Sequence, residues 1–165
     1  MERIDVYKAY FGENTTYYAN ELEKQEQGRK ITFNFSAGLF GACWFLYRKM
    51  YLEGAVIWIL SILLGFIIDY IVASLSTGQA HFNNSLSNFI ALVLSFLTWS
   101  LLGNYIYIKK ARRVVEPFLQ DHNVEEPEST DLAELEHKGG TSLFPAVLPF
   151  ILAFVVLVLC MLFIK

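Results

Sequence analysis

The chain has 165 residues, of which 55% are apolar and 16% aromatic, and its mean hydropathy is +0.39. Soluble domains are about 45–50% apolar even when glycine is counted, so the composition favours a membrane protein. The net charge of −3 disfavours a nucleic-acid-binding protein, because such proteins present a basic surface. The apolar residues occur in long blocks separated by charged residues, which is typical of membrane spans.

Residues 1–32 form a polar cytoplasmic segment before the first apolar block. Asn14 is suited to cap a short helix that begins at Thr15, and Gly28 suits the position after its end. The segment is rich in aromatic residues, namely Tyr7, Tyr10, Phe11, Tyr17 and Tyr18. We expect these side chains to cover a small cluster or to contact lipid headgroups. No apolar stretch follows the charged N-terminus, so we expect no cleavable signal peptide.

Residues 33–51 include an apolar stretch that is too short to cross a bilayer. As a helix, residues 33–47 would span about 22 Å, whereas the hydrocarbon core is about 30 Å thick. Lys and Arg flank the stretch on both sides, which indicates that both of its ends are cytoplasmic. We therefore predict one short interfacial or re-entrant helix. Small residues at a spacing of four make it a candidate helix-packing surface: Ala37, Gly38, Gly41 and Ala42.

Three later stretches are long and apolar enough to cross a bilayer. They cover residues 52–75, 86–108 and 143–164, and the polar residues 76–85 predict an external turn between the first two. Residues 109–142 form the cytoplasmic linker, which is basic at its start and acidic afterwards. The predicted fold is therefore an all-α integral membrane protein with three transmembrane helices plus one short interfacial or re-entrant helix.

Two features of the linker lead to further structural predictions. Pro117 is expected to end the helix of the second span, because its ring and missing N–H interrupt the hydrogen-bond ladder. A short helix is expected over residues 131–136, and Gly139 and Gly140 after it are interpreted as a flexible hinge before the last span.

The distribution of positive charge predicts the orientation. Four cations directly follow the second span (Lys109, Lys110, Arg112 and Arg113), whereas residues 76–85 contain no Lys or Arg. Because positive charge marks the cytoplasmic side, the N-terminus is expected inside and the C-terminus outside. The four cations are also candidate contacts for anionic lipid headgroups.

The most specific sequence motif lies in residues 33–51. It begins with Phe33-Asn34, continues through Ala37 and an aromatic- and glycine-rich run, and ends in Trp44-Phe-Leu-Tyr-Arg-Lys-Met-Tyr51. Three other stretches fit the same pattern: Tyr7–Asn14 with Tyr17-Tyr18, Asn104–Tyr107, and Gly139–Ser142. The chain thereby resembles a family of small bacterial membrane proteins catalogued as domain of unknown function 2628.

The resemblance has two departures and limited implications. Phe35 stands where tryptophan is expected, and Gly38 where a bulky residue is expected. The resemblance implies a bacterial cytoplasmic (inner) membrane location for a multi-pass protein. It implies no assigned activity and supplies no catalytic residues.

Asp69 is the one acid within the body of an expected span. An ionisable residue inside a membrane segment is a functional-site hypothesis by default. Asp69 is therefore a candidate functional intramembrane acid that faces the helical hairpin, with Ser95 or Asn88 as neighbours. The alternative is a hydrated carboxylate near the outer headgroups.

No motif in the sequence predicts catalysis. The three histidines lie in separate polar segments without the spacing of a metal site, so we expect no catalytic, cofactor-binding or metal-binding residues. We predict a non-enzymatic accessory, adaptor or structural subunit that acts through helix packing and its cytoplasmic segments. The alternative is a small oligomeric transporter, channel or lipid-handling protein with Asp69 in the pathway. The expected partners are the lipid bilayer and either a membrane protein or a second copy, with no nucleic acid.

Overall fold

The computed structural model describes residues 2–75, 80–121 and 129–163, and α-helix is the only regular secondary structure in these ranges. Its eight helices are α1 (Arg3–Phe11), α2 (Thr15–Glu26), α3 (Phe35–Phe40), α4 (Ala42–Tyr47), α5 (Tyr51–Leu75), α6 (Ala80–Asp121), α7 (Ser129–Lys138) and α8 (Leu143–Phe163). This confirms the predicted all-α class.

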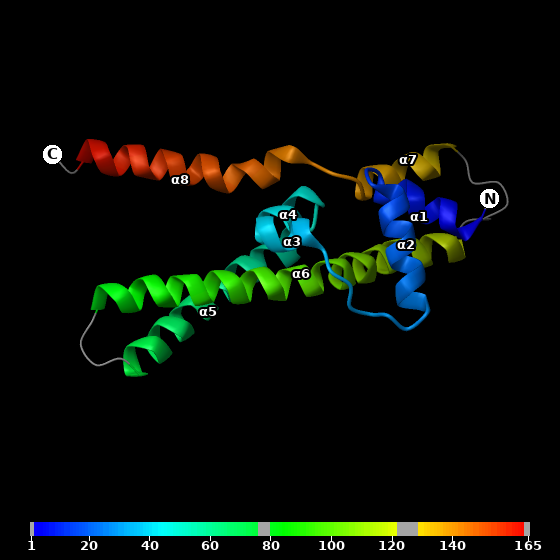
Figure 1. The fold of residues 1–165 in the computed structure, drawn as a ribbon. Coiled ribbons are helices and arrows are strands. Elements are labelled where there is room, and N and C mark those ends of the chain that lie inside the picture. The colour runs from blue at the N-terminus through cyan, green and yellow to red at the C-terminus, as the bar shows by residue number, and fades with distance from the viewer. Residues whose placement is uncertain (1, 76–79, 122–128, 164–165) are drawn as a thin grey trace.

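The helices separate into two regions along the length of α6 (Figure 1). Helices α1, α2 and α7 gather at its C-terminal part, whereas α5 runs beside its N-terminal part. Helix α8 extends away from α1, α2 and α7, toward the same end of the molecule as α5 and the beginning of α6. Helices α3 and α4 lie between the two regions. We call α1, α2, α7 and the C-terminal part of α6 the polar-end bundle.

Two helices in the described part of the chain are long and apolar enough to cross a membrane: Tyr51–Leu75 and Ser85–Gln120. In their most apolar windows only 11% and 22% of the residues, respectively, are buried inside the structure. A core helix of a soluble protein would be mostly buried. These two helices instead leave most of the residues in those windows exposed or partly exposed.

The polar-end bundle has an aromatic core that the N-terminal segment and α6 form together. The ring centroid of Tyr107 on α6 lies 4.7 Å from that of Tyr18 on α2 and 5.8 Å from that of Phe11 on α1. Tyr7 and Tyr10 are also almost completely buried. Four of the five aromatic residues thus form the expected cluster, whereas Tyr17 is 39% exposed. Helix α1, which carries three of them, was not predicted from the sequence.

Two short helices replace the single helix expected over residues 33–47. The chain breaks at Gly41, whose φ of +49° is a conformation that L side chains rarely adopt. Asn34 caps the first of these helices, because its side chain accepts a hydrogen bond from the backbone N of Ala37 at 2.9 Å. The break lets α3 pack on α6 while α4 packs on α5 and α8.

The prediction that Pro117 ends a helix is wrong, because α6 continues through it to Asp121. Contacts on the preceding residues explain the continuation. Val115 is fully buried, and the Glu116 carboxylate accepts hydrogen bonds from Arg3 and Tyr7. Tertiary contacts thus stabilise the turn that proline weakens.

Gly139 and Gly140 form a docked turn, not the free hinge that we expected. The backbone N of Gly140 donates to the carbonyl of Tyr10 at 2.9 Å, and a Cβ on Gly139 would lie 1.9 Å from that same oxygen. Residues 122–128 of the expected linker and 76–79 of the expected external turn lie outside the described residues. Helix α6 already begins at Ala80, within that expected turn.

Candidate functional site

A buried polar network joins the N-terminal segment to α6 around Asn104. The side-chain Oδ1 of Asn104 accepts a hydrogen bond from Nδ2 of Asn34 at 2.8 Å. Its Nδ2 lies 2.8 Å from the Tyr17 hydroxyl, 3.0 Å from Oγ1 of Thr32 and 3.2 Å from a Glu21 carboxylate oxygen. An amide nitrogen has two protons for these three acceptors, so the network has more than one satisfied arrangement.

The charge within this network is compensated locally. Glu21 is only 3% exposed, and its carboxylate accepts hydrogen bonds from Thr32 and from Lys24, the latter at 2.6 Å. A buried carboxylate is costly unless it is paired and hydrogen-bonded. The network therefore holds an ordered junction between α2, the segment before α3, and α6.

Arg48 is a second buried polar centre, and its charge is not compensated in the same way. The residue is 2% exposed, and its Nη1 donates to the carbonyl oxygens of Phe11 and Glu13, both at 3.2 Å. Its Nε is buried without a hydrogen-bond acceptor. In the described ranges no carboxylate lies within ion-pair distance of its guanidinium, which sits 4.5 Å from the Tyr18 ring centroid and 5.3 Å from that of Tyr107.

The aromatic rings provide partial compensation for this cation through their negative faces. The reciprocal effect appears on Tyr18: burial raises the pKa of its hydroxyl, and the nearby Arg48 guanidinium opposes that rise. Aromatic rings and carbonyl oxygens solvate a cation but leave its net charge in place. The site can therefore attract an anion.

A cavity of about 390 Å³ lies beside Arg48, between α4 and α8. One part of its wall is polar and includes Asn14, Tyr18, Tyr47 and Arg48. The rest is largely apolar and comes from Phe40, Cys43, Trp44, Leu143, Ala146, Val147 and Phe150, with Ser36 as the exception. The cavity is therefore amphipathic.

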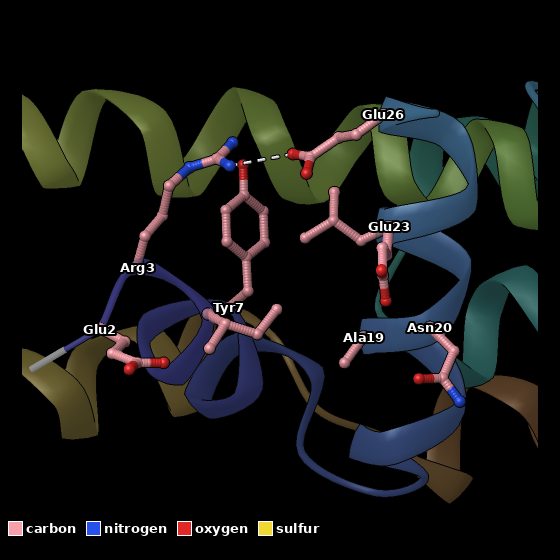
Figure 2. A pocket seen from close by; sticks show the side chains of 9 residues that line it. Glu2, Arg3, Tyr7, Ala19, Asn20, Glu23 and Glu26 are labelled. Atoms are coloured by element: carbon pink, nitrogen blue, oxygen red, sulfur yellow. Dashed lines mark hydrogen bonds and ion pairs between the residues drawn. The ribbon is translucent and has the colours of Figure 1, made fainter. Parts of the chain in front are cut away.

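A second cavity, of about 480 Å³, lies between α1 and α2 in the polar-end bundle. Figure 2 shows Tyr7 pointing between Arg3 and Glu26, which form an ion pair of 2.9 Å. The Glu116 carboxylate on α6 accepts from the Tyr7 hydroxyl at 2.6 Å and from Arg3 at 2.5 Å, and these two contacts lower the pKa of Glu116. The groups around this cavity are thus largely paired with one another.

Family membership follows from a match to a family model. The model described as Protein of unknown function (DUF2628) matches residues 7–113. The chain belongs to this family. The matched residues include Asn34, Arg48 and Asn104, so both buried polar centres lie within the DUF2628 region. No curated protein and no solved structure matches the chain.

The four small residues that were predicted to pack are placed differently from one another. Ala37 and Gly38 lie against α6: a Cβ on Gly103 would be 2.5 Å from Cβ of Ala37, and a Cβ on Gly38 would be 2.7 Å from the Phe96 carbonyl oxygen. Gly41 has open space around it and serves the break between the helices. Ala42 approaches α5, where its carbonyl oxygen would lie 3.4 Å from a Cβ on Gly54.

The four cations that follow the expected second span, which we call the basic cluster, differ in their contacts: two lie near carboxylates and two are exposed. Lys110 forms an ion pair of 3.1 Å with Glu53 of α5, and Arg112 lies 4.0 Å from the Glu26 carboxylate. Lys109 lies over the Tyr105 ring, and Lys109 and Arg113 are both exposed. Among the described residues, these two side chains form no ion pair.

Asp69 lies on α5 with its side chain exposed, and it joins neither buried polar centre. Of its expected neighbours, Ser95 is half-buried on α6 and Asn88 is exposed. The described structure brings neither of them into a hydrogen bond with Asp69. As for metals, the described residues contain no group of three or more His, Cys, Asp and Glu that could hold an ion.

The sequence did not single out Arg48 as a site residue, because its positive charge was interpreted only as a marker of the cytoplasmic side of the membrane. A cation that directly follows Tyr47, within the motif of residues 33–51, was the available indication. Asn104 could have been recognised in a similar way, because it is an amide within an apolar stretch and is followed by Tyr105 and Tyr107.

Proposed function

We propose that the protein is a multi-pass inner-membrane protein that acts by contact, as a non-enzymatic adaptor or structural subunit. In this arrangement α5, the apolar part of α6 and α8 cross the bilayer, and α3 and α4 enter it from the cytoplasmic side without crossing. The polar-end bundle is the cytoplasmic region that partners contact. The N-terminus is then inside and the C-terminus outside.

The exposed apolar surface of α5 and α6 is the observation that carries this proposal. Large apolar side chains face outward along α5, including Leu52, Trp58, Phe66 and Leu75, each at least 60% exposed. A bilayer covers such a surface on all sides. Helix α8 supports a third crossing, because its exposed residues are also apolar and it leaves the bundle in the same direction as α5 (Figure 1).

Polar contacts at one level of the fold support the position of the cytoplasmic boundary. The Lys110 ammonium contacts Glu53 in the first turn of α5, and it also donates to the carbonyl of Lys49 at 3.4 Å. The Lys49 ammonium donates to the carbonyl of His137 at 2.8 Å, at the end of α7. The beginning of α5, the basic part of α6 and the end of α7 thus meet at one height, where positive charge is expected.

Cysteine labelling in intact cells tests the orientation. Cys43 and Cys160 are first replaced by serine, and single cysteines are introduced at Asn20, Ser85 and Glu134. With a membrane-impermeant maleimide we expect labelling at position 85 only, and labelling at 20 and 134 only after the membrane is permeabilised. Labelling at position 20 in intact cells would overturn the arrangement.

Gentle detergent extraction followed by mass analysis tests the adaptor role. We expect a second, different protein to copurify with the wild-type chain. A matched pair of variants locates the contact: Glu23→Lys changes the exposed face of the polar-end bundle, and Leu97→Ala changes an exposed apolar residue on α6. Loss of the partner with Glu23→Lys alone supports a cytoplasmic contact, and a wild-type chain that elutes without any partner contradicts the adaptor role.

Asp69 favours a second candidate, an oligomeric transporter or channel. Its carboxylate is exposed between Phe66 and Tyr70, which are 68% and 77% exposed, so it would face lipid in a single copy. A charged group in that position is costly, and a second copy packed on this face of α5 would shield it. Crosslinking through cysteine at Tyr70 tests this candidate: a dimer that Asp69→Asn weakens supports it, and no dimer argues against it.

A further inference from the structure

Arg48 combines deep burial with incomplete compensation of its charge. Two carbonyl oxygens and two close aromatic rings surround the guanidinium, but its Nε has no acceptor and none of the described carboxylates pairs with it. An unpaired buried cation is strongly destabilising in general, because its hydration is lost. An anion that enters the neighbouring cavity would remove this cost.

The cavity beside Arg48 also restricts which anion fits. Its polar wall is continuous with the polar-end bundle through Asn14 and Tyr18, whereas its apolar wall follows α8 through Leu143, Val147 and Phe150. A small inorganic anion would leave this apolar wall uncovered. At about 390 Å³ the cavity lies within the size range of pockets that bind small organic ligands, roughly 300–1,000 Å³.

The direction of the cavity matches that of a lipid in the proposed bilayer. Arg48 precedes Lys49, whose carbonyl contacts Lys110, so the polar wall lies at the level of the basic cluster. The apolar wall continues along α8, in the direction that the proposed spans take (Figure 1). A headgroup at Arg48 would therefore place an acyl chain beside α8.

We propose that the cavity between α4 and α8 binds one anionic membrane phospholipid, with its phosphate at Arg48 and an acyl chain along Val147 and Phe150. The guanidinium suits this role, because its planar set of N–H donors matches the oxygens of a phosphate. Tyr47 belongs to the same polar wall, and its hydroxyl donates to the Glu13 carboxylate at 2.7 Å. This inference rests on the proposed membrane arrangement.

Lipid retention by the full-length protein tests the proposal. The protein is purified in mild detergent, incubated with equal amounts of phosphatidylglycerol and phosphatidylcholine, and analysed by native mass spectrometry. We expect one phosphatidylglycerol to be retained per wild-type chain in preference to phosphatidylcholine. Soluble glycerol 3-phosphate at the same concentration should not compete, because it lacks the acyl chain.

Three variants locate the binding site. Arg48→Met keeps the apolar stem but removes the charge, and we expect phosphatidylglycerol retention to weaken about tenfold or more, as for the loss of charge-assisted hydrogen bonds. Ala146→Trp fills the apolar part of the cavity, keeps Arg48 in place, and should weaken retention comparably. Arg29→Met removes an exposed cation after α2 that does not line the cavity, and it should leave retention unchanged.

Each contrary result has a definite meaning. Equal retention of the two lipids, undiminished retention by Ala146→Trp, or a loss caused by Arg29→Met would overturn the proposed site, as would full competition by glycerol 3-phosphate. Alkaline carbonate washing of the cell membranes separates this inference from the proposed function. A chain that stays in the washed membrane but retains no lipid contradicts only the lipid site, whereas a chain released by the wash contradicts the membrane arrangement itself.

Discussion

Asn34 and Asn104 lie 70 positions apart in the chain, and their side-chain amides meet in a hydrogen bond of 2.8 Å. Both residues are buried, at 5% and 0% exposed. The backbone N of Asn34 also donates to the carbonyl of Ser100, one turn before Asn104, at 2.7 Å. These two bonds set the point at which the N-terminal segment crosses α6, and they place α3 on the same helix.

Replacement of Asn104 by leucine should release this crossing. The variant has a similar volume, but it leaves the Asn34 amide and the Glu21 carboxylate without their shared partner. Unsatisfied buried groups cost about 1–3 kcal/mol each, so we expect the free energy of unfolding to fall by about 3 kcal/mol. Thermal unfolding measures the loss, and faster proteolysis between α2 and α3 locates it. Asn20→Leu, at an exposed position of α2, is the control and should change little.

Gly139 should not tolerate a side chain. An added Cβ would lie 1.9 Å from the carbonyl oxygen of Tyr10, which is backbone and cannot rotate away. We expect Gly139→Ala to displace α7 from α1 and to lower the free energy of unfolding by about 2 kcal/mol. Faster proteolytic cleavage near α7 would show the displacement. Gly65→Ala serves as the control, since a Cβ there meets nothing within 4 Å; equal effects of both variants would contradict the docked turn.

The ion pair between Lys110 and Glu53 should couple the beginning of α5 to α6. Their side chains are 26% and 25% exposed and lie 3.1 Å apart, so the pair is shielded more than a surface pair. We expect Lys110→Glu and Glu53→Lys to destabilise the protein singly and the double exchange to recover about 1 kcal/mol. A double-mutant cycle on the thermal midpoint measures this coupling, and strictly additive effects would show that it is absent.

Glu116 should make the polar-end bundle sensitive to acid. Hydrogen bonds from Tyr7 and then from Arg3 lower the pKa of this carboxyl in the folded protein. Its contribution to stability is therefore present above the ordinary glutamate pKa of about 4.3, and it is lost as the pH falls through the lower folded value.

The pH dependence of stability for Glu116→Gln checks this prediction. We expect the variant to be less stable than the wild type at neutral pH and the difference to shrink below about pH 4. Because the side chain is 41% exposed, solvent screening keeps the effect small. Glu23→Gln is the comparison; a difference from the wild type that stays constant with pH in Glu116→Gln would contradict the assignment.

Much of the helical organisation was predictable from the sequence, because it depends on local properties of the chain. The apolar run over residues 52–75 forms the helix α5, because a long run without proline can satisfy its backbone hydrogen bonds within a helix. The expected short helix over residues 131–136 lies within α7 for a similar reason. The family assignment also needs no structure, because the family model matches the sequence of residues 7–113.

The candidate sites were not predictable in this way, because their residues come from separate parts of the chain. In the sequence, Arg48 only indicated which side of the membrane is cytoplasmic. It becomes a buried cation because Tyr18 and Tyr107 approach it from two other helices. Pro117 looked like a helix end, and only the contacts that Glu116 makes with α1 explain why α6 continues. The sequence alone thus determined the all-α class, the apolar helices and the family. Tertiary packing decided which polar residues became buried, because burial depends on contacts between segments that local pattern does not specify.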